Sequence, residues 1–157
     1  MEPKIVTREA FKVMGVEDSF SFLEENDPGF QKIWMERYMS YDDQVKPLST
    51  DKAYYEVFFK SDEPETPPTR YLAGMAVKDV SNVPEGLIVR EIPAARYAVF
   101  DTTLAAIGET TDYVDRQWLP ASQYELDRPK PHFGLFPPDT ASGDSPVTLW
   151  IPIREKS

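Results

Sequence analysis

The stretch from residue 53 to residue 77 reads AYYEVFFK (53–60), SDEPETPPT (61–69) and RYLAGMAV (70–77), and it decides the fold. Its first and last segments are rich in aromatic and aliphatic residues, as β-strands are. The middle segment holds three prolines and three acidic residues. Proline has no N–H to donate to a neighbouring strand, so this segment cannot be a central strand. We therefore predict two strands joined by an exposed connection, as in a long hairpin.

Helical periodicity flanks this hairpin on both sides. Asp27 and Pro28 suit the N-cap and the first position of a helix. Apolar residues then recur at steps of three and four, which places them on one helical face. In the first helix this face holds Phe30, Ile33, Trp34, Arg37, Tyr38 and Tyr41, and in the second it holds Leu104, Ile107, Thr111, Val114 and Trp118. Pro120 is expected to end the second helix.

The remaining apolar segments are expected to be strands. They are residues 4–16, with a bend or break near residues 9–10, and residues 87–92, 96–100, 132–136 and 147–153. The order strand, helix, strand, strand then occurs twice, in a repeat of about residues 1–80 and a second of about residues 87–157. We predict an α+β fold in which these pseudo-symmetric repeats form one concave antiparallel sheet with two helices packed on it. The single domain would span residues 1–157, with a ligand cleft where the halves meet.

The charge and composition exclude several kinds of partner. The net charge is −10 and no segment concentrates lysine and arginine, so we expect no binding to nucleic acid or to anionic membranes. The chain has no cysteine, which removes disulfides and thiolate metal sites. No leader or membrane-spanning stretch is seen, so we expect a soluble, cytoplasmic protein, monomeric or dimeric.

Five short motifs in the second half carry a family resemblance. They are YLAG (71–74), VPEGL (83–87), IPAARYAVF (92–100), WLPAS (118–122) and WIPI (150–153). Their order and spacing resemble the gyrase-inhibitory-protein-like (GyrI-like) small-molecule-binding family, which includes the effector-binding domains of AraC- and MerR-type multidrug regulators. The resemblance implies two tandem strand–helix–strand–strand units and a pocket for lipophilic, often cationic, compounds.

The chain departs from that family in two ways. Regulators of the family carry a helix-turn-helix region on the same chain, whereas all 157 residues here are assigned to the ligand domain. The resemblance also implies a pocket glutamate after a phenylalanine in the penultimate strand, and the matching position here is Gly134. We therefore expect a stand-alone binder with a weaker preference for cations.

Aromatic residues are the main candidates for ligand contacts, because flat side chains offer large contact areas and tyrosine hydroxyls orient polar groups. Such residues are also ordinary core residues, so only some of them are expected to touch a ligand, with Trp150, Tyr71 and Tyr97 first. The ligand-binding candidates are Trp34, Tyr38, Tyr71, Tyr97, Trp118, His132, Phe136 and Trp150. Glu56 interrupts an apolar strand and is either a solvent-facing residue or a substitute acid at the pocket rim, beside Tyr54 and Phe58.

Catalytic, metal and cofactor sites have little support. His132 is the only histidine, no G-x-S-x-G motif surrounds a serine, and no phosphate loop or metal-ligand spacing occurs. We predict no catalytic residue, no metal and no cofactor. The leading hypothesis is a binding protein for amphipathic, lipophilic or aromatic small molecules. The alternatives are a hydrolase of reactive drug-like compounds of the cyclopropanoid hydrolase type and an acidic regulator of a protein partner such as DNA gyrase.

Overall fold

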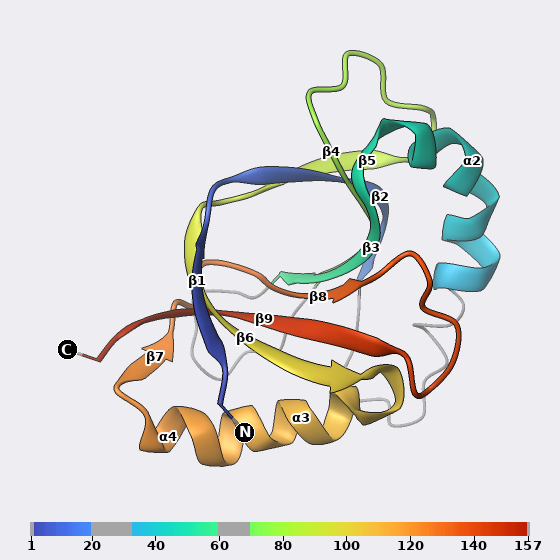
Figure 1. The fold of residues 1–157 in the computed structure, drawn as a ribbon. Coiled ribbons are helices and arrows are strands. Elements are labelled where there is room, and N and C mark those ends of the chain that lie inside the picture. Colours follow the sequence, from blue (N-terminus) through green and yellow to red (C-terminus); the bar gives the residue numbers. More distant parts are fainter. Residues whose placement is uncertain (1, 20–32, 60–69, 157) are drawn as a thin grey trace.

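One antiparallel sheet dominates the computed structural model, which describes residues 2–19, 33–59 and 70–156 (Figure 1). Within these residues the sheet has nine strands. They are β1 (Lys4–Arg8), β2 (Phe11–Ser19), β3 (Ser49–Phe59), β4 (Arg70–Val77), β5 (Ile88–Ile92), β6 (Ala95–Thr103), β7 (Tyr124–Leu126), β8 (His132–Phe136) and β9 (Pro146–Glu155). The predicted break near residues 9–10 separates β1 from β2. The predicted helix start at Asp27 and the connection at 61–69 lie outside the described residues.

Two helical segments accompany the sheet. Segment one runs through η1 (Ile33–Arg37), η2 (Tyr38–Tyr41), α2 (Asp42–Val45) and η3 (Lys46–Leu48). Segment two runs through η4 (Leu104–Ala106), α3 (Ile107–Tyr113), η5 (Val114–Trp118) and α4 (Leu119–Ala121). Both were predicted as single helices. Each is instead a succession of short turns, with a wide π-type turn at η1 and at η5.

The strand order is β1-β6-β9-β8-β3-β4-β2-β5, and β7 pairs with β9. This order is symmetric about the central β8–β3 pair, because β6-β9-β8 on one side corresponds to β2-β4-β3 on the other. The predicted α+β fold is therefore confirmed. Two features were not predicted. Strand β7 has only three residues, and β1 and β5 each pair with a strand of the opposite half.

Strand alternation divides the apolar side chains between two faces of the sheet. On one face, segment one covers a cluster that includes Tyr71 and Met75, and segment two covers a cluster that includes Phe100 and Leu149. On the other face, Tyr55, Tyr97 and Phe133 belong to a third cluster. The two helices thus lie over opposite halves of the same face, as the ribbon shows (Figure 1). No helix of the described residues is long and apolar enough to cross a membrane.

Candidate ligand-binding site

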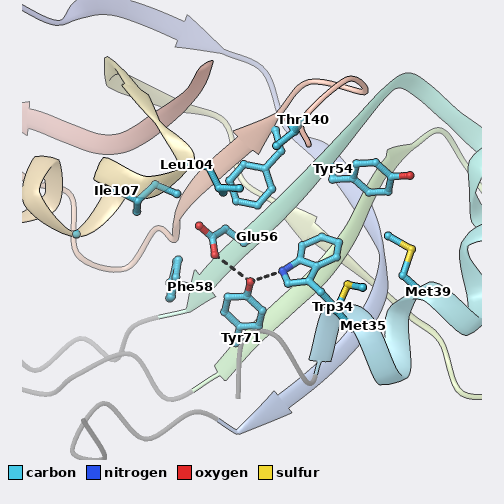
Figure 2. A pocket seen from close by; sticks show the side chains of 12 residues that line it. Trp34, Met35, Met39, Tyr54, Glu56, Phe58, Tyr71, Leu104, Ile107 and Thr140 are labelled. Atoms are coloured by element: carbon cyan, nitrogen blue, oxygen red, sulfur yellow. Dashed lines mark hydrogen bonds between the residues drawn. The ribbon is translucent and has the colours of Figure 1, made fainter. Parts of the chain in front are cut away.

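A pocket of about 610 Å³ lies between the two helical segments, above the central strands (Figure 2). Segment one forms one wall and segment two the opposite wall, while β3, β4 and β8 form the floor. The described lining residues are Trp34, Met35, Met39, Tyr54, Glu56, Phe58, Tyr71, Leu104, Ile107, Gly108, Phe136 and Thr140. Among these described lining residues, Glu56 is the one with a carboxyl group, and none carries an amino or guanidinium group. The described part of the lining is therefore apolar and aromatic, with one acidic group.

Glu56 points into the pocket because of its place in β3. Tyr54, Glu56 and Phe58 alternate with Tyr55 and Val57, which face the other side of the sheet. The Glu56 side chain is buried, with 7% of the residue exposed. The predicted alternative of a solvent-facing Glu56 is thus wrong. The acid lies in the pocket between Tyr54 and Phe58.

A short chain of hydrogen bonds leads from segment one to this carboxyl group. The Nε1–H of Trp34 donates to the hydroxyl oxygen of Tyr71 at 2.7 Å, and the Tyr71 hydroxyl donates to Oε1 of Glu56 at 2.9 Å (Figure 2). Among the described residues no side chain donates to Oε2. Within the described lining, Oε2 thus has room for a further donor or for a positive charge.

Burial sets the protonation behaviour of this group. Removal from water disfavours the charged form and raises the pKa of Glu56 to about 7, although the hydrogen bond from Tyr71 lowers it in part. Burial, together with the charge of Glu56, raises the pKa of Tyr71 well above its usual range. Tyr71 consequently remains a neutral donor at physiological pH. Glu56 changes charge near neutrality.

Gly134 lies directly across from Glu56 in the β3–β8 register. A Cβ atom at Gly134 would lie 3.0 Å from Oε2 of Glu56 and 3.3 Å from Cε1 of Phe136. The glycine therefore leaves room for a carboxyl group that comes from the neighbouring strand. The expected weaker preference for cations assumed that the loss of an acid at residue 134 leaves the pocket without one, and this assumption is wrong.

Three of the predicted ligand-binding residues line the pocket, namely Trp34, Tyr71 and Phe136. Tyr38 is fully buried behind them, with its ring 5.2 Å from that of Trp34. His132 stacks on Phe58 with ring centroids 4.6 Å apart, next to the pocket but outside its described lining.

The structure does not bring Tyr97, Trp118 and Trp150 to this pocket. Tyr97 and Trp150 lie on the opposite face of the sheet, where their ring centroids are 5.5 Å apart. Trp118 belongs to segment two and packs against Phe100 of the sheet, at 5.2 Å between ring centroids. In β9 the alternation turns Leu149 and Ile151 toward segment two, so Trp150 between them must face away.

Several pocket residues were not among the predicted ligand contacts. Alternation from Glu56 indicates Tyr54 and Phe58, which share its face of β3. Periodicity indicates that Leu104 and Ile107 share one face of segment two, although it does not show that this face borders a pocket. Met35, Met39, Gly108 and Thr140 had no signal in the sequence.

Among the described residues the pocket lining is largely apolar and holds one buried carboxyl group, an arrangement that suits a small organic molecule. The model of the Cass2 family, described as integron-associated effector binding proteins, matches residues 4–153. The chain therefore belongs to this family of effector-binding domains. No match was found among curated protein sequences.

Solved structures share the fold at low sequence identity. SAV2435, solved bound to tetraphenylphosphonium, is 15% identical, with a TM-score of 0.76 over 98% of this chain and 94% of that one. The Cass2 integron cassette protein of Vibrio cholerae is 15% identical, with a TM-score of 0.66 over 98% and 96%. The C-terminal domain of EcmrR is 14% identical, with a TM-score of 0.61 over 99% and 98%. The family match confirms the resemblance to effector-binding domains found in the sequence, and these neighbours share the fold.

Proposed function

We propose that this protein binds lipophilic organic cations in the pocket between the two helical segments. The observation that carries the proposal is the carboxyl group of Glu56, which is 7% exposed and lies in a pocket whose other described residues are uncharged. An isolated buried carboxylate is costly, so it is neutralised either by a proton or by a cation. A cationic ligand relieves that cost, whereas an anionic ligand increases it.

The pocket walls suit the apolar part of such a ligand. Trp34, Tyr54 and Phe136 present aromatic rings, whose faces attract cations as well as apolar groups. Met35 and Met39 lie at the rim and are 69% and 43% exposed. Methionine side chains are flexible and polarisable, so they adapt to ligands of different shapes. This combination favours a range of bulky compounds over a single tightly fitted one.

The relatives give independent support for this ligand class. One neighbour of the same fold was solved bound to tetraphenylphosphonium, a cation with four phenyl groups. The family is described by effector binding. The net charge of −10 favours the approach of cations and disfavours nucleic acid as a direct ligand.

Calorimetric titration with a matched charge series tests the proposal. Tetraphenylphosphonium and tetraphenylborate have nearly the same shape and opposite charge, and triphenylphosphine oxide is a neutral comparison. At pH 8 we expect saturable binding of the phosphonium and at least ~tenfold weaker binding of the other two. Equal affinities for phosphonium and borate, or no binding of any of the three, would contradict the proposal.

Hydrolysis of reactive drug-like compounds is a second candidate, and one observation favours it. A carboxyl group with a pKa of about 7 that is hydrogen-bonded to a neutral tyrosine hydroxyl is suited to general acid–base chemistry near neutral pH. Incubation with an activated cyclopropane substrate tests this function. Turnover that disappears in Glu56→Gln would support it, and an unchanged substrate would remove it.

A further inference from the structure

We propose that Gly134 is a specificity-determining residue of the pocket: the space left by its missing side chain holds the carboxyl group of Glu56 where a ligand's positive charge is recognised. The inference rests on the proposed binding of cations and concerns how the pocket produces that preference. In this arrangement β3 supplies the carboxyl group and β8 supplies the space that it occupies.

The register of the sheet places the two residues together. Glu56 on β3 is the cross-strand partner of Gly134 on β8. Both residues are buried. Directly opposite side chains in an antiparallel pair are close neighbours on one face of the sheet. A side chain at residue 134 would therefore project into the region where Glu56 lies.

The contacts of a Cβ atom built at Gly134 identify the group that uses this space. That atom would lie 3.0 Å from Oε2 and 3.1 Å from Cγ of Glu56, and 3.3 Å from Cε1 of Phe136. Each distance is shorter than ordinary van der Waals contact. Even a methyl group would have to displace the carboxyl group or the Phe136 ring. Larger side chains would occupy the position of the carboxyl group itself.

The hydrogen bond from Tyr71 holds one oxygen of the Glu56 carboxyl group, so a displacement of this group would strain or break that bond. Oε1 of Glu56 is fixed at 2.9 Å from the Tyr71 hydroxyl, which in turn accepts the Trp34 N–H at 2.7 Å. Oε2 is the oxygen on the side of Gly134. A side chain at residue 134 therefore crowds Oε2 directly, and the carboxyl group can yield only by moving against the hydrogen bond that holds Oε1. We expect it to lower the affinity for cations while largely sparing neutral ligands.

Gly108 provides a matched control, since it also lines the pocket. A Cβ atom at Gly108 would have no neighbouring atom within 4 Å. Gly108→Ala adds the same methyl group to the same pocket without reaching Glu56. Alanine is also favoured over glycine in helices, so this variant is expected to remain folded.

The test measures affinities for tetraphenylphosphonium and triphenylphosphine oxide in the wild type, Gly134→Ala and Gly108→Ala. For Gly134→Ala we expect a loss of ~tenfold or more for the cation and of no more than ~threefold for the neutral compound. Gly108→Ala should keep the wild-type preference. If both variants weaken cation binding equally, the role of Gly134 is overturned while the proposed function stands. If the wild type shows no preference for the cation, both proposals fail.

An exchange of the two residues gives a second, independent test. Glu56→Ala is expected to lose the preference for the cation. The double variant Glu56→Ala, Gly134→Glu places a carboxyl group in the same space from the opposite strand, so it should regain the preference. Thermal melting checks that each variant is folded. A folded double variant with the affinity of Glu56→Ala would contradict the inference.

Discussion

Strand β3 separates two aromatic clusters that resemble each other in composition and differ in what lies at their centre. On one face, Glu56 lies in the pocket beside Trp34 and Tyr71. On the other face, the guanidinium group of Arg8 lies 3.8 Å from the ring centroid of Phe11. It is also 5.3–5.5 Å from the ring centroids of Tyr55, Phe133 and Trp150. We call these five residues the Arg8 cluster.

The Arg8 cluster already contains its cation. Arg8 donates from Nη2 to the Tyr55 hydroxyl at 2.9 Å, and that hydroxyl donates to Oδ2 of Asp51 at 2.6 Å. The positive charge is thus held by ring faces and a hydrogen-bonded partner. The pocket has the opposite arrangement: among the described residues, an acid with one hydrogen-bond donor lies beside open space. From this comparison we expect the Arg8 cluster to stabilise the fold and propose that the pocket takes an external cation.

Replacement of the central charge on each face gives the largest expected contrast. Glu56→Gln keeps the shape of the side chain and removes its charge, so tetraphenylphosphonium should bind ~30-fold to 100-fold more weakly at pH 8. Arg8→Gln on the opposite face should leave that affinity within ~twofold of wild type. Calorimetric titration of both variants checks this contrast. Equal losses in the two variants would show that the faces are not functionally distinct.

The pH dependence of binding should also separate the faces. Because the pKa of Glu56 is raised to about 7, cations must compete with a proton below neutral pH. Affinity for tetraphenylphosphonium should fall by up to ~tenfold for each pH unit below about 7 and stay level above it. Arg8→Gln should retain this profile, and Glu56→Gln should abolish it. A flat profile in the wild type would exclude Glu56 as the recognising group.

The same pKa shift affects stability, with a definite sign. The pKa of Glu56 rises from an ordinary 4.5 to about 7 in the folded chain, so between these values the folded state holds a proton that the unfolded state has lost. The contribution of Glu56 is therefore most favourable below pH about 4.5, decreases as pH rises toward 7, and is constant above. The total change is on the order of 3 kcal/mol. Denaturant unfolding at pH 8 should find Glu56→Gln more stable than the wild type, and lower stability would contradict the shift.

Arg8 should contribute to stability alone. Arg8→Gln removes the charge over the rings and shortens the side chain that covers them, with an expected cost of about 1–2 kcal/mol. For a chain of this size this cost corresponds to a decrease in Tm of roughly 3–6 °C. Thermal unfolding measures it, and Lys4→Gln on the same strand, at an exposed position, is the control. Equal Tm values for the two variants would show that the Arg8 cluster adds nothing measurable.

The sequence predicted most of the fold because the elements are strongly patterned. The strands predicted at 53–60 and 70–77, observed as β3 and β4, and the helical faces of Trp34 and Val114 follow clear periodicities. Strand β7 was missed because three residues, Tyr124–Leu126, are too few to show alternation. The pairing of β1 with β6 was also missed, since no local pattern determines which distant strand covers an edge.

The candidate site was harder to predict because several strands are apolar on both faces. In β9 the sequence VTLWIPI places apolar residues at almost every position, so alternation does not indicate the direction of Trp150. Tyr97 has the same difficulty in RYAVF. Glu56 was placed beside Tyr54 and Phe58 because a polar residue inside an apolar strand provides a reference point. The space beside Gly134 could not be predicted, because it depends on which strand lies beside β3. Gly134 pairs with Glu56 in the sheet but is 78 positions further along the chain.

The smallest expected effect comes from the tryptophans, one on each face of the sheet. Trp34→Phe keeps a ring in the pocket wall and removes the N–H that donates to Tyr71, so the affinity for tetraphenylphosphonium should fall by roughly threefold to tenfold. Trp150→Phe should leave it unchanged, because Trp150 lies in the Arg8 cluster.

Fluorescence adds a second readout. The chain has three tryptophans, and Trp34 is the one in the described pocket lining, so the ligand-dependent signal should be lost in Trp34→Phe and kept in Trp150→Phe. The reverse result would place the ligand on the Arg8 face and would mean that an external cation displaces Arg8 from its rings.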